Sequence, residues 1–497
     1  MPVDLTQTNI DPKEYQSLLE DLQGNIIKGY DCDYSVHIFL KFGSDSNAIK
    51  KWIRSFAEEF VTSAKQQLEN SELEQTSNHQ KSQGLFVNFF LSASGYKVLG
   101  FELKGKRRKF PAWTFLAGMK VFQNSLKDPP VEEWEKGFQS DIDALILLTD
   151  NDCENLQEQA KTVMQQVNDV AWIINTEVGN VLRNDKIQPD GKGQIIEHFG
   201  FRDGISQPLF LKPDIEQAKE QGNHQWDSSA PLELVLVKDP FGQGDDSYGS
   251  YCVYRKLEQD VQGFKDREQQ LAQKLELTGK DVERAGALIV GRFRDGTPIT
   301  LSPSEQGEAA VLNNFNFTDD AEGTKCPFHA HIRKTNPRGE NGNTFESPEE
   351  QRFHRIVRRA ITYGGTSAAR VALQSAISRF QHQLRLFNEE MLQAAKEDKV
   401  GLLFLCFQSD IFDQFMFVQN NWANQRDFVQ YETGLDAVIG QGKQQTTGSQ
   451  NWPKEWGKNC TVQFDFFNFV TPKGGEFFFA PSISFLKTIE SHFVTRS

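Results

Sequence analysis

An alternation of strand-like and helix-like segments in the first third of the chain is the sequence feature that most restricts its fold. Three short apolar runs are typical of buried strands, at residues 36–42, 84–92 and 140–148. Apolar residues that recur every three or four positions predict amphipathic helices over about 46–68 and over 153–167. Strand, helix, strand, strand and helix follow one another in the order of a ferredoxin-like α+β unit.

A broadly similar mixture of elements follows a polar stretch, residues 213–229, which is predicted to join two halves of the chain. Strands are predicted at 232–237, 250–257, 401–407 and 475–480, and helices at about 259–275 and 411–421. With 497 residues the chain is long enough to bury two cores. The pattern permits two domains, with residues 1–225 in the first and residues 226–497 in the second.

The charge and the cysteine pattern disfavour several classes of protein. The chain carries 54 basic and 68 acidic side chains and a formal net charge of −14, which disfavours nonspecific binding to nucleic acid or to an anionic membrane. No apolar run approaches the roughly 20 residues of a membrane span, and the first residues lack the pattern of a secretory signal. Six scattered cysteines without a Cys-x-x-Cys pair favour free thiols. We therefore expect a cytoplasmic protein with no nucleic-acid and no membrane partner.

Three separate segments contain the side chains that a haem peroxidase requires. Residues 326–338 hold two histidines two positions apart, residues 200–208 hold an aspartate beside glycines, and residues 356–359 hold two adjacent arginines. A haem iron needs an axial ligand, for which neutral imidazole is the usual choice. Cleavage of peroxide on the opposite face needs a proton shuttle and a fixed positive charge. One histidine, one aspartate and one arginine would meet these requirements.

In these motifs the chain resembles the dye-decolourising peroxidases, haem enzymes of the dimeric α+β barrel superfamily. The Gly-x-x-Asp-Gly motif of that family corresponds to residues 200–204, its His-Ile-Arg run to residues 331–333, and its Arg-Arg pair to residues 358–359. Further segments that are similar to the family follow in the same order, at residues 22–29, 249–260, 291–298, 401–408 and 475–482. The resemblance therefore covers most of the chain.

The resemblance implies both a fold and a reaction. The fold would consist of two ferredoxin-like α+β domains with antiparallel sheets, and one haem b per chain would lie between a sheet and helices. Residues 1–225 would carry the Gly-x-x-Asp-Gly motif, and residues 226–497 the haem ligand and the distal arginine. The protein would reduce hydrogen peroxide while oxidising bulky organic electron donors, such as dyes and phenolics, in one-electron steps. It would act as a monomer or a homo-oligomer.

The resemblance also assigns a role to one residue of each motif, and each residue has an alternative. His331 is the expected iron ligand, but on a strand His329 would share its face. Asp203 is the expected proton shuttle, although an aspartate between two glycines also suits a tight turn. Arg358 is expected to stabilise the charge of the departing oxygen. Arg359 competes for that role, and on a helix the two side chains would diverge by about 100°.

Residues around the expected haem are assigned in the same way. Arg333 would pair with a haem propionate, or it would be a surface cation. Asp427 would accept the second ring N–H of the ligand histidine, which such histidines usually donate to an oxygen, or it would be an exposed loop acid. Leu402 and Phe404 are two positions apart and would share one face of a strand, where they would narrow the distal cavity or fill the core.

Three residues near Asp203 complete the expected site. Gly204 and Ile205 follow it directly and are expected to line the cofactor site, and His198 lies near enough in the sequence to reach the same pocket. Bulky electron donors could not enter a narrowed pocket and would need electron relay from a surface tryptophan or tyrosine.

Two other functions remain open, one on the same fold and one on a related fold. One is a haem carrier or sensor without turnover, although such a protein has no use for an acid–base pair. The other is an enzyme resembling the chlorite dismutases, a group that lacks the acid at the position of Asp203.

Overall fold

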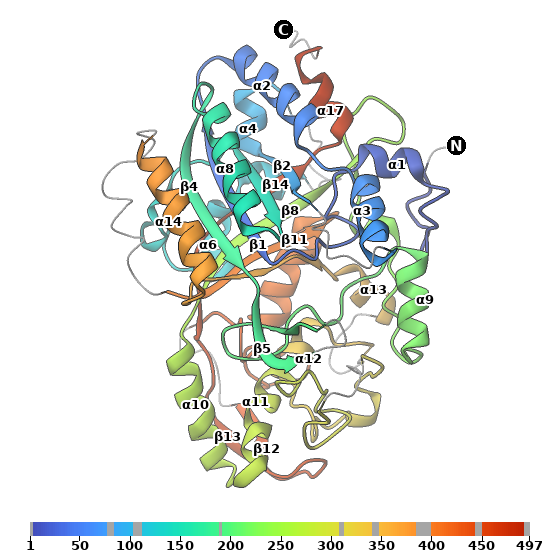
Figure 1. Ribbon diagram of the computed structural model, residues 1–497. Helices are drawn as coiled ribbons and strands as arrows, with labels where there is room; N and C mark the ends of the chain where they lie inside the picture. Colours follow the sequence, from blue (N-terminus) through green and yellow to red (C-terminus); the bar gives the residue numbers. More distant parts are fainter. Residues whose placement is uncertain are drawn as a thin grey trace.

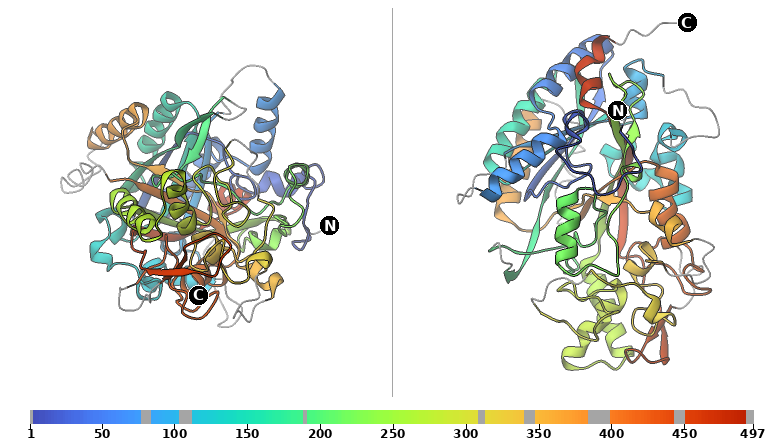
Figure 2. Two further views of the ribbon diagram at one scale, coloured as in Figure 1. Left: turned by 90° about the horizontal axis from the view of Figure 1, so that it is seen from below. Right: turned by 90° about the vertical axis from the view of Figure 1, so that its right-hand side faces the viewer.

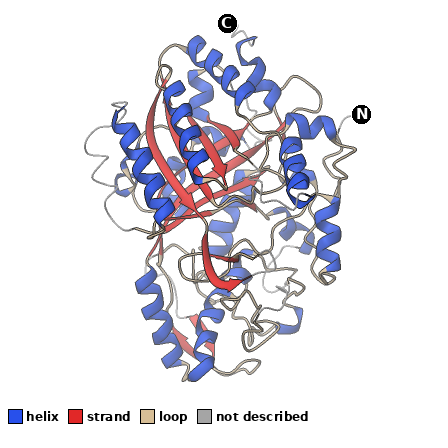
Figure 3. Cartoon of the chain, viewed as in Figure 1, coloured by secondary structure: helices blue, strands red, loops and turns tan. Residues whose placement is uncertain are grey.

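The computed structural model describes residues 3–76, 84–102, 112–187, 191–307, 313–339, 347–383, 399–442 and 450–491. Long strands occupy the middle of the upper half of the molecule, and helices surround them (Figure 3). In the turned view of Figure 2 (right), helices lie on both sides of the strands. A lower body of helices, loops and two short strands lies beneath them (Figure 1).

The first half of the chain forms a ferredoxin-like unit, as predicted. Its strands pair antiparallel in the order β2-β3-β1-β4, and they are β1 (Tyr34–Phe42), β2 (Phe86–Ser92), β3 (Ala144–Asp150) and β4 (Ala171–Asn180). The helix predicted over about 46–68 is instead two helices, α2 (Ser46–Glu59) and α3 (Ala64–Thr76), and the second predicted helix is α8 (Cys153–Val167). Asp45 and Asp152 begin α2 and α8, because each carboxylate accepts hydrogen bonds from two backbone N–H groups of the first turn.

The second half supplies a sheet of the same design. Its four main strands pair antiparallel in the order β14-β8-β11-β10, and they are β8 (Tyr248–Gln259), β10 (Ile361–Tyr363), β11 (Gly401–Gln408) and β14 (Val470–Ala480). The two sheets join at both edges, because β4 pairs with β10 and β2 pairs with β14. At the first junction a Cβ on Gly179 would lie 2.5 Å from Ile361 and from Ser35, so only glycine permits this approach. The predicted α+β fold with antiparallel sheets is confirmed.

Three further predictions differ from the structure. Residues 232–237 form no long strand, because a 3-10 turn, η3 (Leu232–Leu234), follows Pro231. From this stretch, the short strand β7 (Val237–Lys238) is the part that pairs with β8. The polar stretch 213–229 contains the helix α9 (Lys212–Glu220), which begins with proline in its first turn. The helix predicted at 411–421 consists of two π-helical segments, η6 (Ile411–Met416) and η7 (Val418–Ala423).

The lower body has its own apolar core and carries the His-Ile-Arg run. Its helices and strands are α10 (Val261–Lys274), α11 (Glu283–Val290), α12 (His331–Thr335), β12 (Gln450–Pro453) and β13 (Thr461–Phe464), and Trp452 and Phe466 lie in its core. The remaining longer helices are α1 (Gln16–Asp21), α4 (Ala93–Val98), α5 (Ala112–Ala117), α13 (Pro348–Phe353), α14 (Ala368–Gln383) and α17 (Ile483–Thr488). Among the described residues, no helix is long and apolar enough to span a membrane.

Candidate functional site

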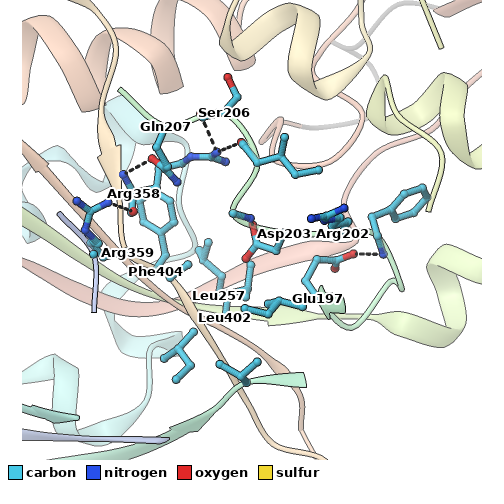
Figure 4. A pocket seen from close by; sticks show the side chains of 18 of the residues that line it. Glu197, Arg202, Asp203, Ser206, Gln207, Leu257, Arg358, Arg359, Leu402 and Phe404 are labelled. Carbon is cyan, nitrogen blue, oxygen red and sulfur yellow. Dashed lines mark hydrogen bonds between the residues drawn. The ribbon is translucent and has the colours of Figure 1, made fainter. Parts of the chain in front are cut away.

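A cavity of about 1490 Å³ is lined by both sheets and by the lower body. Side chains of β8 and β11 form one wall, and the segment after β6 (Gly193–Ile196) forms another. Figure 4 shows Asp203 of this segment above Leu257, Leu402 and Phe404, with Arg358 on the same side of the cavity. His331 and Ile332 of α12 line the same cavity from the lower body.

His331 is the first residue of α12, and a buried carboxylate holds its ring. Its Nδ1 lies 3.0 and 3.2 Å from the two carboxylate oxygens of Asp436. Burial would raise the pKa of Asp436, but His331 and the backbone N–H groups of Ile439 and Val438 keep it below its ordinary value. With Nδ1 bonded to an anion, Nε2 is the ring nitrogen available to a metal, which is the usual arrangement of a metal-binding histidine.

The prediction that Asp427 would be this carboxylate is therefore wrong. Asp427 is an exposed loop residue whose carboxylate accepts a hydrogen bond from the backbone N–H of Glu432, 2.8 Å away. Asp436 was not considered, although it stands in the apolar run Leu435-Asp-Ala-Val-Ile439. An acid inside such a run must find a partner when it is buried, and that was the available signal.

His329 does not compete with His331. Because α12 begins between them, the two rings do not share a face: His331 lines the cavity, whereas His329 is 1% exposed and packs against Trp452 with ring centroids 4.2 Å apart. Burial lowers the pKa of His329 to about 3, so this ring is neutral.

Arg333 is not placed to meet a cofactor, contrary to the prediction. Its side chain is fully buried, and its guanidinium donates to the Asp320 carboxylate at 2.9 Å and to the Asp320 carbonyl at 2.8 Å. The rings of Phe317 and Phe328 lie 4.7 and 4.4 Å from the guanidinium. Arg333 therefore fixes the loop before α12, and it does not line the cavity.

Arg333→Leu is expected to lower the free energy of unfolding by about 3–5 kcal/mol, because it leaves the Asp320 carboxylate buried without its cation. Arg54→Leu is the matched control. Arg54 and Glu490 form an ion pair whose side chains are 42% and 38% exposed, so the loss should stay below about 1 kcal/mol. Urea unfolding of both variants measures the difference, and equal losses would contradict a structural role for Arg333.

Asp203 lies on a backbone hairpin formed by residues 195–203. Its backbone N–H donates to the carbonyl of Ile195 at 3.1 Å, and its carboxylate accepts the N–H of Gly204 at 2.7 Å. Gly200 and Gly204 have φ values of 95° and 77°, a region that favours glycine. Asp203 is thus a turn residue, and its side chain also lines the cavity together with Gly204 and Ile205.

Arg358 and Arg359 point to different partners, because they lie at a strand and not on a helix. Arg358 ends β9 (Val357–Arg358), and its Nη2 donates to the carbonyl of Ile205 at 3.0 Å (Figure 4). The guanidinium of Arg359 donates to the carbonyls of Asn25 at 2.8 Å and Ile26 at 3.2 Å. Arg358 is therefore joined to the Asp203 segment, whereas Arg359 holds the N-terminal region of the chain.

The wall below Asp203 is apolar. Leu402 and Phe404 both line the cavity from β11, and Leu257 pairs with Leu402 in the neighbouring strand. His198 does not line the cavity, because its Nε2 lies 2.8 Å from the carbonyl of Tyr363.

A group of buried arginines in the cavity wall was missed at the level of sequence. Burial lowers the pKa of Arg292 to about 9, and the positive charges of Arg358 and Arg202 contribute. Burial, Arg292 and Arg355 also lower the pKa of Arg338, whose hydrogen bonds to Phe315, Asn313 and Ser206 all end on neutral oxygens. These cations repel one another, so the cavity favours an anionic ligand.

Comparisons with known proteins agree with this geometry. Residues 21–183 match the family model described as the DyP dimeric alpha+beta barrel domain. The multifunctional dye peroxidase DyP2 of Amycolatopsis sp. is 38% identical over 98% of this chain and all of the relative. The crystal structure of a DyP-type peroxidase from Anabaena sp. has a TM-score of 0.84 and 44% identity, with 98% of this chain and 99% of that chain covered. The dye-decolorizing peroxidase msp1 of Mycetinis scorodonius is 28% identical over 95% of this chain and 88% of its own. The chain therefore belongs to the dye-decolourising (DyP-type) peroxidase family and is an oxidoreductase that acts on peroxide.

Proposed function

We propose that the cavity binds one haem b, that His331 Nε2 would hold its iron, and that Asp203 and Arg358 act on hydrogen peroxide in the same cavity. The observation that carries this proposal is that a histidine held by a buried carboxylate lines the same cavity as Asp203 and Arg358. The family consists of haem enzymes, and the bound haem would supply the iron that accepts and returns electrons.

The residues of the cavity fit a haem in three respects. His331 offers a nitrogen ligand whose other ring nitrogen is already bonded to Asp436. Leu257, Leu402 and Phe404 give the apolar wall that a porphyrin face requires. The arginine group supplies positive charge for two propionates, and among the described residues the hydrogen-bond acceptors of Arg338 are neutral oxygens. Arg338, rather than Arg333, is therefore our choice for the propionate partner.

Asp203 and Arg358 have different roles in the reaction with peroxide: proton transfer and stabilisation of negative charge. With haem bound to supply two electrons and to take the second oxygen atom, the Asp203 carboxylate would accept a proton from hydrogen peroxide and return it to the oxygen that leaves as water. The Arg358 guanidinium stabilises the negative charge that develops on that oxygen, and its hydrogen bond to Ile205 fixes it in advance.

The organic donors are proposed to be dyes and phenolics, which give up one electron at a time. The names of the relatives support this class, because they include a multifunctional dye peroxidase and a dye-decolorizing peroxidase in complex with 2,6-dimethoxyphenol. Leu402 and Phe404 narrow the cavity, so bulky donors would give electrons to exposed aromatic side chains. Trp113, Trp172 and Tyr431 are 58%, 58% and 68% exposed and are suited to that contact.

One spectrum distinguishes this function from a haem carrier or sensor. The Soret band of the haem-loaded protein should change on addition of one equivalent of hydrogen peroxide and return when a phenolic donor is added. A carrier would keep its spectrum unchanged by peroxide.

Six free cysteines support a reducing compartment, and we propose the cytoplasm as the location.

Arg358→Leu is expected to slow the reaction with peroxide by about 10²–10³-fold while haem stays bound, because one preorganised charge is removed. Arg359→Leu is the matched control. It should be milder, since Arg359 bonds to backbone carbonyls of Asn25 and Ile26 away from Asp203. Stopped-flow mixing with peroxide measures both rates. A larger loss in Arg359→Leu would assign the role to the other arginine.

A further inference from the structure

Glu197 stands at the base of the hairpin that carries Asp203, and its side chain also lines the cavity. Its backbone N–H donates to the carbonyl of Phe201 at 3.0 Å, and its carbonyl accepts the N–H of Gly200 at 2.8 Å. Figure 4 shows Glu197 beside Arg202 and Asp203, above the strand that carries Leu257. The hairpin is short, so any movement of its turn moves Asp203.

Three donors converge on the Glu197 carboxylate. The backbone N–H groups of Phe199 and Phe201 donate to its two oxygens at 2.8 and 2.9 Å. The side-chain amide of Gln259 donates to it at 2.6 Å. Gln259 is the last residue of β8, two positions after Leu257 in the cavity wall. The carboxylate therefore closes the turn of the hairpin and also ties the hairpin to the sheet.

We propose that Glu197 is a positioning residue for the peroxide reaction, and that its carboxylate holds the Asp203 hairpin at a fixed place against β8. This inference rests on the proposed role of Asp203. Glu197 acts through backbone N–H groups and Gln259, and it takes no part in proton transfer itself. Hydrogen bonds to an ionised carboxylate are about twice as strong as neutral ones, so a single side chain can hold the turn.

Burial and neighbouring charges shift the pKa of the Glu197 carboxylate. Burial raises the pKa of Glu197 to about 7, its three hydrogen-bond donors oppose this, and the charge of Asp203 adds to it. Two further charged groups near the turn are Arg294, which is paired with Glu268 and Glu283, and Arg202, whose pKa burial lowers. Burial also lowers the pKa of His198. The raised pKa means that burying the charge costs stability progressively as the pH rises from 4.5 to about 7, whereas the three hydrogen bonds that hold the turn are strongest to the ionised form.

The first test is amide hydrogen exchange of the haem-loaded protein. In Glu197→Gln the amide N–H groups of Phe199 and Phe201 should exchange about 10- to 100-fold faster, because an amide NH₂ now faces N–H donors. Gln259→Leu should remove the bond between the hairpin and β8 and accelerate amide exchange of Phe199 and Phe201 by a smaller factor. This variant provides the test if Glu197→Gln fails to fold. Glu283→Gln removes a nearby carboxylate that bonds to Arg294 instead, and exchange in the hairpin should not change. Unchanged exchange in both Glu197→Gln and Gln259→Leu would overturn the proposal.

The second test separates positioning from a purely structural role. Glu197→Gln should slow the reaction with peroxide about 10- to 100-fold, but it should add nothing in an Asp203→Asn background, since it acts through Asp203. Equal slowing in both backgrounds would refute the proposal. If Asp203→Asn by itself has no effect, the proposed function fails, while amide exchange still decides whether Glu197 holds the hairpin.

The pH dependence of stability gives an independent readout. Relative to wild type, Glu197→Gln should gain stability as the pH rises from 4.5 to about 7, because the variant lacks the buried charge. A difference that stays constant over that range would mean that the three hydrogen bonds offset the cost of burying the charge, and amide exchange in the hairpin is then the test that decides the proposal.

Discussion

His331→Ala is expected to lose haem or to hold it weakly, whereas His329→Ala should retain it. Of these two imidazoles, that of His331 lines the cavity, and its Nδ1 bond to Asp436 orients Nε2 toward a metal. Alanine removes the only bond that we assign between the protein and the iron. Haem content and the Soret band of the purified variants measure the effect.

His329→Ala is the control variant, because His329 is buried in the core of the lower body and does not line the cavity. Its ring packs against Trp452, so His329→Ala should lower stability without removing haem. Equal haem content and an unchanged Soret band in His331→Ala would refute the assignment. Loss of haem in His329→Ala but not in His331→Ala would assign the iron ligand to His329.

Asp203→Asn is expected to keep haem and to slow the reaction with peroxide by roughly 10²–10⁴-fold, the range of general acid–base catalysis. Asparagine preserves the shape of the side chain and can still accept the N–H of Gly204, so the turn should survive. It cannot accept the proton of peroxide. Because the Arg358 guanidinium remains in place, we expect the slowing to lie near the lower end of this range.

Stopped-flow mixing with peroxide over about pH 4–7 decides the role of Asp203. An amide exchange measurement on the same variant shows whether the hairpin is intact, which separates lost chemistry from lost structure. A rate within about twofold of wild type throughout would leave Asp203 as a turn residue and Arg358 as the main catalytic group.

The sequence by itself determined the features that depend on local patterns. Strand and helix periods predicted three strands of the first ferredoxin-like unit, β1, β2 and β3, because each is an apolar run long enough to be recognised. The fourth strand, β4, was not predicted, because polar residues interrupt its apolar run. The order of short motifs indicated which histidine, aspartate and arginine lie around one cavity. The spacing of Leu402 and Phe404 also placed both on one wall, since side chains two apart on a strand share a face.

Only the tertiary structure decided which partners those residues meet. Asp436, not Asp427, reaches His331, because the pairing depends on how the loop after η7 folds under α12 and not on its distance in the sequence. Arg333 lies on α12, but its side chain pairs with Asp320 in the segment before that helix, so its charge is not available to the cavity.

The joining of the two sheets was equally beyond local reasoning. The pairing of β4 with β10 brings together residues 179 and 363, and it depends on a glycine whose importance appears only when Ile361 packs against it. Strand and helix periods depend on neighbours in the sequence, whereas ion pairs, buried carboxylates and edge pairings depend on chain segments that meet only after folding. The sequence therefore determined most of the long strands and helices and the motif residues of this protein, and the tertiary structure decided their partners.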